Sequence, residues 1–184
     1  MNPPREHTIL VTCFDDLDPS LLHQVRREIG KRFGCRTEAG NLLQDVEFAL
    51  DRARDQYHST LILEKVAELA PLHVSKVLAI VNVDLFIPIL THVYGEAQLG
   101  GKTAIISTFR LDEGLPVLSN PKSFYRRVVK EAIHELGHTF NLRHCPDHTC
   151  IMHYCRTVRD MDRKSDQLCR YCRILLADEM KKPP

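Results

Sequence analysis

The sequence predicts an α+β (α/β-like) fold in which a mixed, twisted sheet packs against several helices. Short apolar runs rich in β-branched residues alternate with longer segments of helical periodicity, which is the order expected when helices cover a sheet. Two of these runs are joined through Gly100-Gly101, which favours an antiparallel pair. A chain of 184 residues is long enough for one compact domain.

Five segments are expected to form strands. The run from Val77 to Phe86 is the strongest of them, because it is almost continuously apolar and rich in Val and Ile. The strands in chain order are His7 to Phe14, Arg36 to Leu43, Val77 to Phe86, Val93 to Leu99 and Lys102 to Phe109. The fourth is the candidate for an edge of the sheet.

The helices are predicted from their caps and from proline. Asp18-Pro19 offers an N-cap followed by proline at the first helical position, so a helix should run to about Gly34. Residues from about Asp45 to Ala70 are expected to be largely helical, in two pieces broken near His58-Ser59, and to end before Pro71. After a loop from Arg110 to Ser119, Asn120-Pro121 repeats the cap signal, and a last helix is expected within Met161 to Met180.

The helix predicted from Pro121 to Asn141 carries the most informative residues. One stripe of this helix is apolar and should face the core; it consists of Val129, Ala132, Ile133, Leu136 and Phe140. His134 and His138 then lie on the opposite face, toward a cleft. Two histidines one turn apart can bind one metal ion, for which zinc is expected, and Glu135 can reach a water on that ion.

A third ligand requires the helix to end. His144 would lie roughly 9 Å further along a continuous helix and off the face of His138. Asn141 is the expected break, because its short amide tolerates the left-handed conformation that ends helices. A left-handed Asn141 would turn the chain back and carry His144 toward the metal.

The pattern of these residues resembles that of the metzincin metallopeptidases, H-E-x-x-H-x-x-G-x-x-H followed by a methionine-containing turn. Asn141 stands where that family usually has glycine, which is a mild departure. Residues further along are similar to the archaemetzincin branch, which carries a second, cysteine-bound zinc; they are Cys145, Cys150-Ile151-Met152 and Cys169-Arg170-Tyr171-Cys172. The resemblance is specific over residues 134 to 172.

The resemblance implies a zincin-like fold with an active-site helix, and a zinc-dependent metallopeptidase that cleaves peptides. Glu135 would be the general base, and short peptides processed from the amino terminus are one substrate class that it suggests. Met152 would pack beneath the zinc, and Tyr154 would help to stabilise the oxyanion, with a structural tyrosine as the alternative. Val93 to Leu99 would be the rim strand that binds extended substrate, or else a plain edge strand.

The cysteine spacing predicts a second metal site. Cys145-x4-Cys150 and Cys169-x2-Cys172 outline a tetrahedral thiolate site for a structural zinc, giving two zinc ions per chain. This zinc would hold together a small C-terminal subdomain of about 142–184, which has too little apolar sequence to be stable alone and follows an N-terminal subdomain of about 1–141 within a single metallopeptidase domain. Disulfides, or His148 in place of one cysteine, are the alternatives.

Three cysteines and two histidines have no place in these sites. Cys13, Cys35 and Cys155 lack partners, and a buried thiol is expected for Cys13. His148 and His153 lie near both sites in the sequence and are expected to be exposed or to support the ligands without binding metal.

The net charge and the first residues of the sequence limit the binding partners and the cellular location that we expect. The net charge of +1 gives no electrostatic case for nucleic acid or for a membrane surface. The polar start from Met1 to Glu6 and the interruption at Asp15-Asp16 do not fit a signal peptide, so a cytoplasmic protein, monomeric and without a membrane segment, is expected. The basic residues of the C-terminal segment should form a solvated face; they are Arg156, Arg159, Arg163, Lys164, Arg170 and Arg173.

Two other functions fit parts of the sequence. A non-catalytic zinc protein could use its cysteine-rich, basic C-terminal segment to bind nucleic acid or a protein partner. A scaffold could also have kept the histidine site and lost turnover. Glu135 argues against a purely structural zinc at the histidines, because such a zinc needs no general base.

Overall fold

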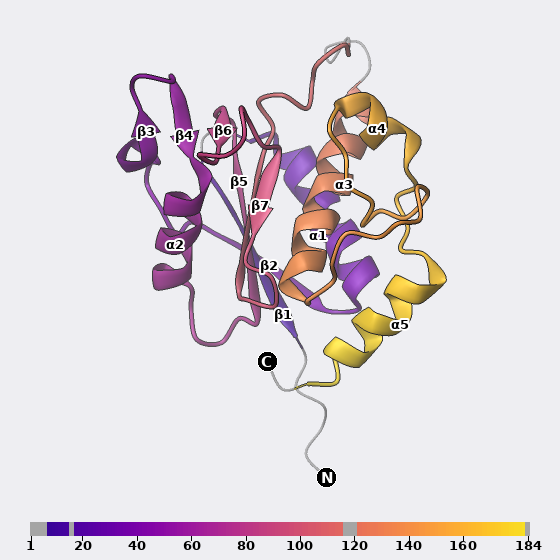
Figure 1. Cartoon of the computed structure of the whole chain (residues 1–184). Helices are drawn as coiled ribbons and strands as arrows, with labels where there is room; N and C mark the ends of the chain where they lie inside the picture. The colour runs from indigo at the N-terminus through magenta and orange to yellow at the C-terminus, as the bar shows by residue number, and fades with distance from the viewer. Residues whose placement is uncertain (1–6, 15–16, 116–120, 183–184) are drawn as a thin grey trace.

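The structure is a computed structural model that describes residues 7–14, 17–115 and 121–182. Its main sheet has five strands in the order β2-β1-β5-β8-β7 (Figure 1). The strands are β1 (Thr8–Cys13), β2 (Arg36–Gly40), β5 (Lys76–Val81), β7 (Gly95–Ala97) and β8 (Thr103–Ser107). The first four strands in the sheet order run parallel, and β7 is antiparallel to β8 at the edge. The predicted mixed sheet, antiparallel pair and edge strand are therefore confirmed.

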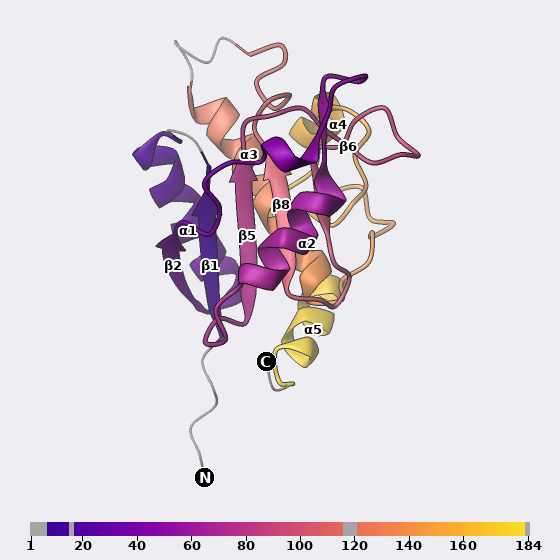
Figure 2. The same ribbon diagram turned by 90° about the vertical axis from the view of Figure 1, so that its left-hand side faces the viewer.

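Helices cover both faces of this sheet (Figures 1 and 2). Helix α2 (Ser59–Leu69) lies on one face, and α1 (Pro19–Phe33) and α3 (Pro121–Thr139) lie on the other. Because side chains alternate along a strand, Leu78 and Ile80 of β5 enter the core beside α1 and α3, whereas Val77 and Ala79 enter the core beside α2. Burial on both faces is why these parallel strands are almost continuously apolar.

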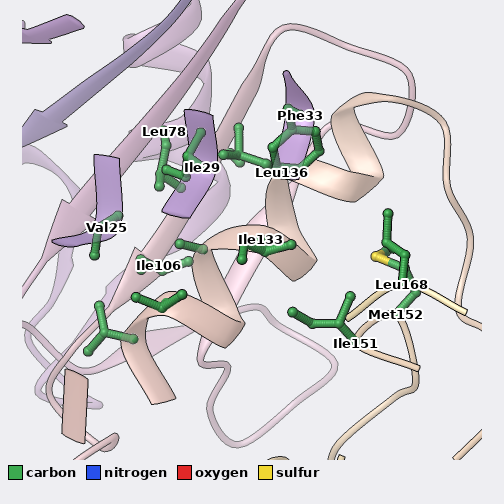
Figure 3. Close-up of a cluster of buried hydrophobic side chains, with 14 of the residues drawn as sticks. Val25, Ile29, Phe33, Leu78, Ile106, Ile133, Leu136, Ile151, Met152 and Leu168 are labelled. Carbon is green, nitrogen blue, oxygen red and sulfur yellow. The ribbon is translucent and has the colours of Figure 1, made fainter. Parts of the chain in front are cut away.

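The helix α3 is packed from more than one side. Ile133 and Leu136 belong to the core shared with α1 and the sheet, which includes Phe33 (Figure 3). Met152 and Leu168, from the segment that follows α3, join the same core. The expectation of one apolar stripe opposite an open face is therefore only partly right, because the chain after α3 wraps back over the helix and buries His134 and Glu135 as well.

The predicted helix caps are found where they can be seen. The Asp18 side chain accepts a hydrogen bond from the Ser20 N–H at 2.8 Å, and Gly34 ends α1 in the left-handed conformation. α2 begins at Ser59 and ends before Pro71, as predicted. The expected cap at Asn120 and the sequence features at residues 1–6 and 15–16 lie outside the described residues.

The prediction of helix from Asp45 to His58 is wrong. This segment forms a 3-10 turn (Glu47–Ala49) and the short strands β3 (Leu50–Asp51) and β4 (Gln56–His58). The two strands pair through a turn in which Asp55 has a φ of 53°. Pairing with a distant strand, which helical periodicity does not reveal, overrides the local preference.

The strand predicted from Val77 to Phe86 divides into two. β5 ends at Val81, and β6 (Leu85–Phe86) joins a second sheet in the order β3-β4-β6. The break lies at Asp84, whose carboxylate accepts hydrogen bonds from Arg110 at 2.6 Å and from Gln56 at 2.9 Å. The partly buried carboxylate of Asp84, which has its own hydrogen-bond partners, lies where the chain leaves the main sheet.

The C-terminal segment holds more regular structure than predicted. Helix α4 (Val158–Arg163) begins at a capping box of Thr157 and Asp160, and α5 (Arg170–Glu179) lies within the range predicted for the last helix. Both lie on the outer side of α3 (Figure 1). Among the described residues, every helix is too short or too polar to cross a lipid bilayer.

Candidate metal centre and active-site cleft

The polypeptide reverses at Asn141, as predicted. α3 ends at Thr139, and Asn141 has a φ of 61°, in the left-handed region. The Asn141 N–H donates to the His138 carbonyl at 2.9 Å, and the Leu142 N–H donates to the Gly137 carbonyl at 3.0 Å. These bonds satisfy the last carbonyls of the helix and turn the chain back along it.

The reversal brings three imidazoles together. One ring nitrogen of each of His134, His138 and His144 lies within 4.8 Å of the others. The Nε2 atoms of His134 and His138 are 3.2 Å apart. Two nitrogen ligands at about 2.0–2.1 Å from a tetrahedral zinc are separated by about 3.3 Å, so this spacing fits a shared zinc ion.

Backbone carbonyls fix the orientation of two of the rings. His134 Nδ1 lies 2.8 Å from the Ile151 carbonyl, and His138 Nδ1 lies 2.7 Å from the Leu142 carbonyl. Each Nδ1 therefore donates, which leaves Nε2 free to bind a metal. Burial lowers the pKa of His138 to about 4 and holds the pKa of His134 well below its ordinary value. Both rings are neutral near pH 7, the form that metals require.

Glu135 lies beneath the edge strand. A Cβ atom at Gly95 of β7 would be 2.6 Å from Glu135 Cγ, so only glycine lets the strand approach this closely. Glu135 and the three histidines line one cavity of about 370 Å³ together with Gly95 and Tyr154. Burial, reinforced by the charge of Glu131, raises the pKa of Glu135 well above its ordinary value.

Glu131 and Lys164 complete the buried charges beside Glu135, and the sequence prediction missed their roles. Glu131 lies one turn before Glu135 on α3. Burial raises the pKa of each carboxyl, and the positive charge of Lys164 opposes this rise. The i, i+4 spacing of two glutamates on the active-site helix was the available signal for Glu131. No local signal marked Lys164.

Lys164 corrects the prediction of a uniformly solvated basic face. Its side chain is buried, with 2% of the residue exposed, whereas the five arginines named with it are exposed. Lys164 Nζ donates to the His153 carbonyl at 3.3 Å and lies 3.5 Å from His134 Nδ1. Its positive charge therefore belongs to the cavity and not to the surface.

Met152 lies under the active-site helix. It is buried, and its Sδ would be 2.5 Å from a Cβ atom at Gly137, between the first two histidines of the motif. Tyr154 is 46% exposed, and its ring centroid is 5.1 Å from that of His144 at the cavity wall. The structure thus places both residues next to the histidines, Met152 below them and Tyr154 at the rim.

Four cysteines form a second cluster. The sulfur atoms of Cys145, Cys150, Cys169 and Cys172 all lie within 4.8 Å of one another, and Cys145 Sγ is 3.8 Å from Cys169 Sγ. Zinc–sulfur bonds of about 2.3 Å in a tetrahedron give about 3.8 Å between sulfurs. The Cys169 N–H donates to Cys150 Sγ at 3.3 Å, as is common around a bound thiolate.

Two alternatives to a four-cysteine metal site are disulfides and a site in which His148 replaces one cysteine. All seven cysteines lie within the described residues and none is in a disulfide, which contradicts the disulfide alternative. His148 is not among the clustered ligands; its ring contacts His153. Cys13 is only partly buried, so the expectation of a buried thiol is partly wrong, although burial still raises its pKa. Burial also raises the pKa of Cys35 to about 12.

This arrangement defines a class of protein, the zinc metallopeptidases of the metzincin type. Its particular family is that of the archaemetzincins, to which the chain belongs: the sequence model of Peptidase family M54 matches residues 22–178. The chain is 37% identical to an archaemetzincin of Methanopyrus kandleri over 136 residues, which are 74% of each chain. It is 34% identical to an archaemetzincin of Methanocaldococcus jannaschii over 177 residues, covering 92% of this chain and 93% of the relative.

Solved structures show the same fold. The crystal structure of the Methanopyrus kandleri archaemetzincin matches with a TM-score of 0.83 at 30% identity and covers 99% of this chain and 100% of that one. The structure of the Archaeoglobus fulgidus archaemetzincin complexed with malonate matches with a TM-score of 0.75 at 29% identity and covers 91% and 99%. The chain is therefore a zinc metallopeptidase that acts on peptides or proteins.

Proposed function

We propose that the chain hydrolyses peptide bonds with His134, His138 and His144 as zinc ligands and Glu135 as the general base. The observation that carries this proposal is the convergence of three neutral imidazoles beside a buried carboxylate in one cavity. Zinc, when bound, lowers the pKa of its water to about 7 and polarises the substrate carbonyl. Glu135 accepts the proton of the attacking water and returns it to the leaving amine.

The environment of Glu135 supports this role. A carboxyl with an ordinary pKa is a weak base near neutral pH, and burial moves the pKa of Glu135 toward the working pH. The positive charge of Lys164 opposes that shift and so favours the ionised carboxylate, which is the form that can accept a proton from water. Tyr154, exposed at the cavity wall beside His144, is proposed to donate to the oxyanion of the tetrahedral intermediate.

The substrate is proposed to bind as an added strand on β7. Tyr94 and Gln98 bond to β8 on either side of the strand, at 2.8 Å and 3.0 Å. Because backbone groups alternate in direction along an antiparallel strand, those of Gly95 and Ala97 face away from β8. Both residues line the cavity, so an extended peptide on this edge would pass over the three histidines.

Cleavage from the amino terminus of short peptides is the finer form of this proposal. It rests on the resemblance to archaemetzincins and is tested with pairs of peptides that differ only in acetylation of the terminal amine. A processing enzyme of this type cleaves the free peptide at least about tenfold faster, a difference of about 1.4 kcal/mol in transition-state binding. Equal rates for the free and the acetylated peptide would contradict cleavage from the amino terminus and indicate an endopeptidase.

The four cysteines are proposed to hold a second, structural zinc. Four thiolates complete the tetrahedral coordination of a zinc ion, so the site needs no open position, and backbone N–H groups donate to the sulfurs of Cys150 and Cys169. A zinc there would cross-link residues 145–150 to residues 169–172 and so hold together the segment of about 142–184, as a subdomain of a single metallopeptidase domain. The chain would then carry two zinc ions.

Replacement of Glu135 by Gln tests the catalytic proposal. Hydrolysis of a peptide library should be abolished while the zinc content of the purified chain stays equal to that of the wild type. Persistence of hydrolysis in Glu135→Gln would overturn the role of Glu135. A wild-type chain that cleaves no peptide and is retained on polyanions in a salt-dependent way would instead favour the non-catalytic zinc protein.

Metal content tests the two sites separately. His138→Ala and Cys169→Ala should each lose one zinc per chain and keep the other, and only Cys169→Ala should strongly reduce the free energy of unfolding. Loss of the same single zinc in both variants would contradict a two-zinc chain.

Four properties of the working protein are also proposed. We propose that the protein binds neither nucleic acid nor an anionic membrane, because a net charge of +1 gives little electrostatic attraction to either. A monomer in the cytoplasm accords with the sequence, and sedimentation and cell fractionation test these two statements.

A further inference from the structure

We propose a third metal site, formed by His148 and His153, that binds a borderline divalent cation such as Zn²⁺ or Ni²⁺. It lies outside both clusters described above, since neither histidine belongs to the three-histidine or the four-cysteine group. The inference does not depend on the peptidase mechanism, because it concerns metal binding by two other side chains.

The spacing of the two imidazoles fits a shared ion. His148 Nδ1 and His153 Nε2 are 3.1 Å apart, close to the 3.2 Å between the Nε2 atoms of His134 and His138. Both distances are near the about 3.3 Å expected for two nitrogen ligands of one tetrahedral ion. The rings meet at an interplanar angle of 72° with centroids 4.5 Å apart, so the facing nitrogens are not stacked.

The tautomer of His153 is set as it is in the active-site histidines. His153 Nδ1 lies 2.8 Å from the Cys145 carbonyl and therefore donates to it, which leaves Nε2 as an acceptor or ligand. The backbone of His153 is also held, because its N–H donates to the Cys150 carbonyl at 2.9 Å and its carbonyl accepts from Lys164 at 3.3 Å. His153 is thus a rigid first ligand.

His148 supplies the second ligand from the surface. It is exposed, and the facing nitrogen is the Nδ1 atom, so a metal can replace the proton that otherwise joins the two rings. Asp147, next to His148, interacts electrostatically with both imidazoles and contributes negative charge near the site. Water would complete the coordination, because the site is open to solvent on the side of His148.

The loop from Cys145 to His153 gives the site a consequence. This loop begins next to His144 and contains two of the clustered cysteines, so it joins the two zinc sites proposed above. A cation bound by His148 and His153 would cross-link the middle of the loop to its end and stabilise the loop against opening.

Calorimetric titration of the zinc-loaded chain with Ni²⁺ tests the proposal. The wild type should bind one equivalent of Ni²⁺, and His148→Gln should bind Ni²⁺ at least roughly tenfold more weakly. Loss of a group that only supports a metal ligand already weakens metal sites by about 10–100-fold, and His148 is a proposed ligand itself. His23→Gln, which removes an exposed histidine of α1, is the matched control and should bind as the wild type does. Zinc content, measured after each titration, should be unchanged in all three proteins.

Two results would overturn the inference. The first is that the zinc-loaded wild type binds no Ni²⁺. The contact between the two rings would then be only a hydrogen bond. The second is a His148→Gln variant with wild-type affinity, which would place the bound Ni²⁺ elsewhere. Because His148 is exposed, His148→Gln should fold as the wild type does, and the test needs no substitution at the less exposed His153.

Discussion

Gly137 lies directly against the sulfur of Met152. A Cβ atom at Gly137 would be 2.5 Å from Met152 Sδ, closer than real Cβ atoms approach other heavy atoms, and 3.0 Å from Met152 Cε. A larger residue between the two histidines of α3 would therefore have to displace the end of a fully buried methionine side chain, fifteen residues further along the sequence. The helix and the turn beneath it are matched surfaces.

Gly137→Ala is expected to destabilise the chain, although alanine favours helices by about 1 kcal/mol over glycine. Overpacking against Met152 should lower the free energy of unfolding by about 1–3 kcal/mol, measured in urea. The same change made in a Met152→Ala background should be tolerated better, because the obstructing sulfur is gone. Equal effects in the two backgrounds would contradict the contact.

Asn141 is expected to tolerate glycine and to resist alanine. Its φ of 61° is left-handed, which alanine adopts at a cost of about 1–2 kcal/mol and glycine adopts freely. Asn141→Ala should lower the free energy of unfolding by about that amount and weaken zinc binding, and Asn141→Gly should do neither. An alanine variant as stable as the glycine variant would argue against the reversal.

Gly95→Ala should reduce catalysis without removing zinc. The added methyl group would press on Glu135 Cγ at 2.6 Å and on the Ile105 carbonyl at 2.8 Å, which displaces either the Glu135 side chain or the edge strand. A displacement of about 1 Å can lower a rate about 100-fold. Ala39→Gly, at an exposed position of the opposite edge strand β2, is the control and should stay near the wild-type kcat/KM. A Gly95→Ala enzyme with full activity would contradict the placement of Glu135 beneath β7.

Lys164→Met should destabilise the chain because it leaves the buried carboxyls of Glu131 and Glu135 without a positive charge. Removal of one partner from a buried charged group typically costs about 3–5 kcal/mol. Addition of Glu131→Gln to Lys164→Met should recover part of that loss, since one of the uncompensated carboxyls is removed. A double variant less stable than Lys164→Met would count against electrostatic pairing in the cavity.

The metal-free chain should lose stability as the pH falls from about 6.5 to about 4. The pKa of His138 is about 4 in the folded chain and 6.5 ordinarily, so between these values the unfolded chain binds more protons. The stabilising contribution of neutral His138 is therefore present above pH 6.5 and is lost on acidification. Urea unfolding of the chelated wild type and of His138→Gln measures it, and the pH dependence should be smaller in the variant.

Local signals predicted much of the fold and both metal clusters. A cap and a proline located α1, a proline located the end of α2, and the apolar runs located β1, β5 and β8, because these features act within a few residues of one another. The same reasoning failed between Asp45 and His58, where pairing of β4 with β6 decides the conformation. It also placed Lys164 on a solvated face, because a lysine that is buried among distant carboxylates looks like any other lysine in a sequence.

The sequence by itself determined which ligands are available and how they are grouped, since the spacing of His134, His138 and His144 and a residue able to turn left-handed at Asn141 are properties of a short segment. Only the tertiary structure decided what surrounds them: the edge strand over Glu135, Met152 under Gly137, and Lys164 and Glu131 beside Glu135. The physical reason is that ligand spacing and turn preference depend on neighbouring residues along the chain. Burial and electrostatic environment depend on which distant segments fold against them.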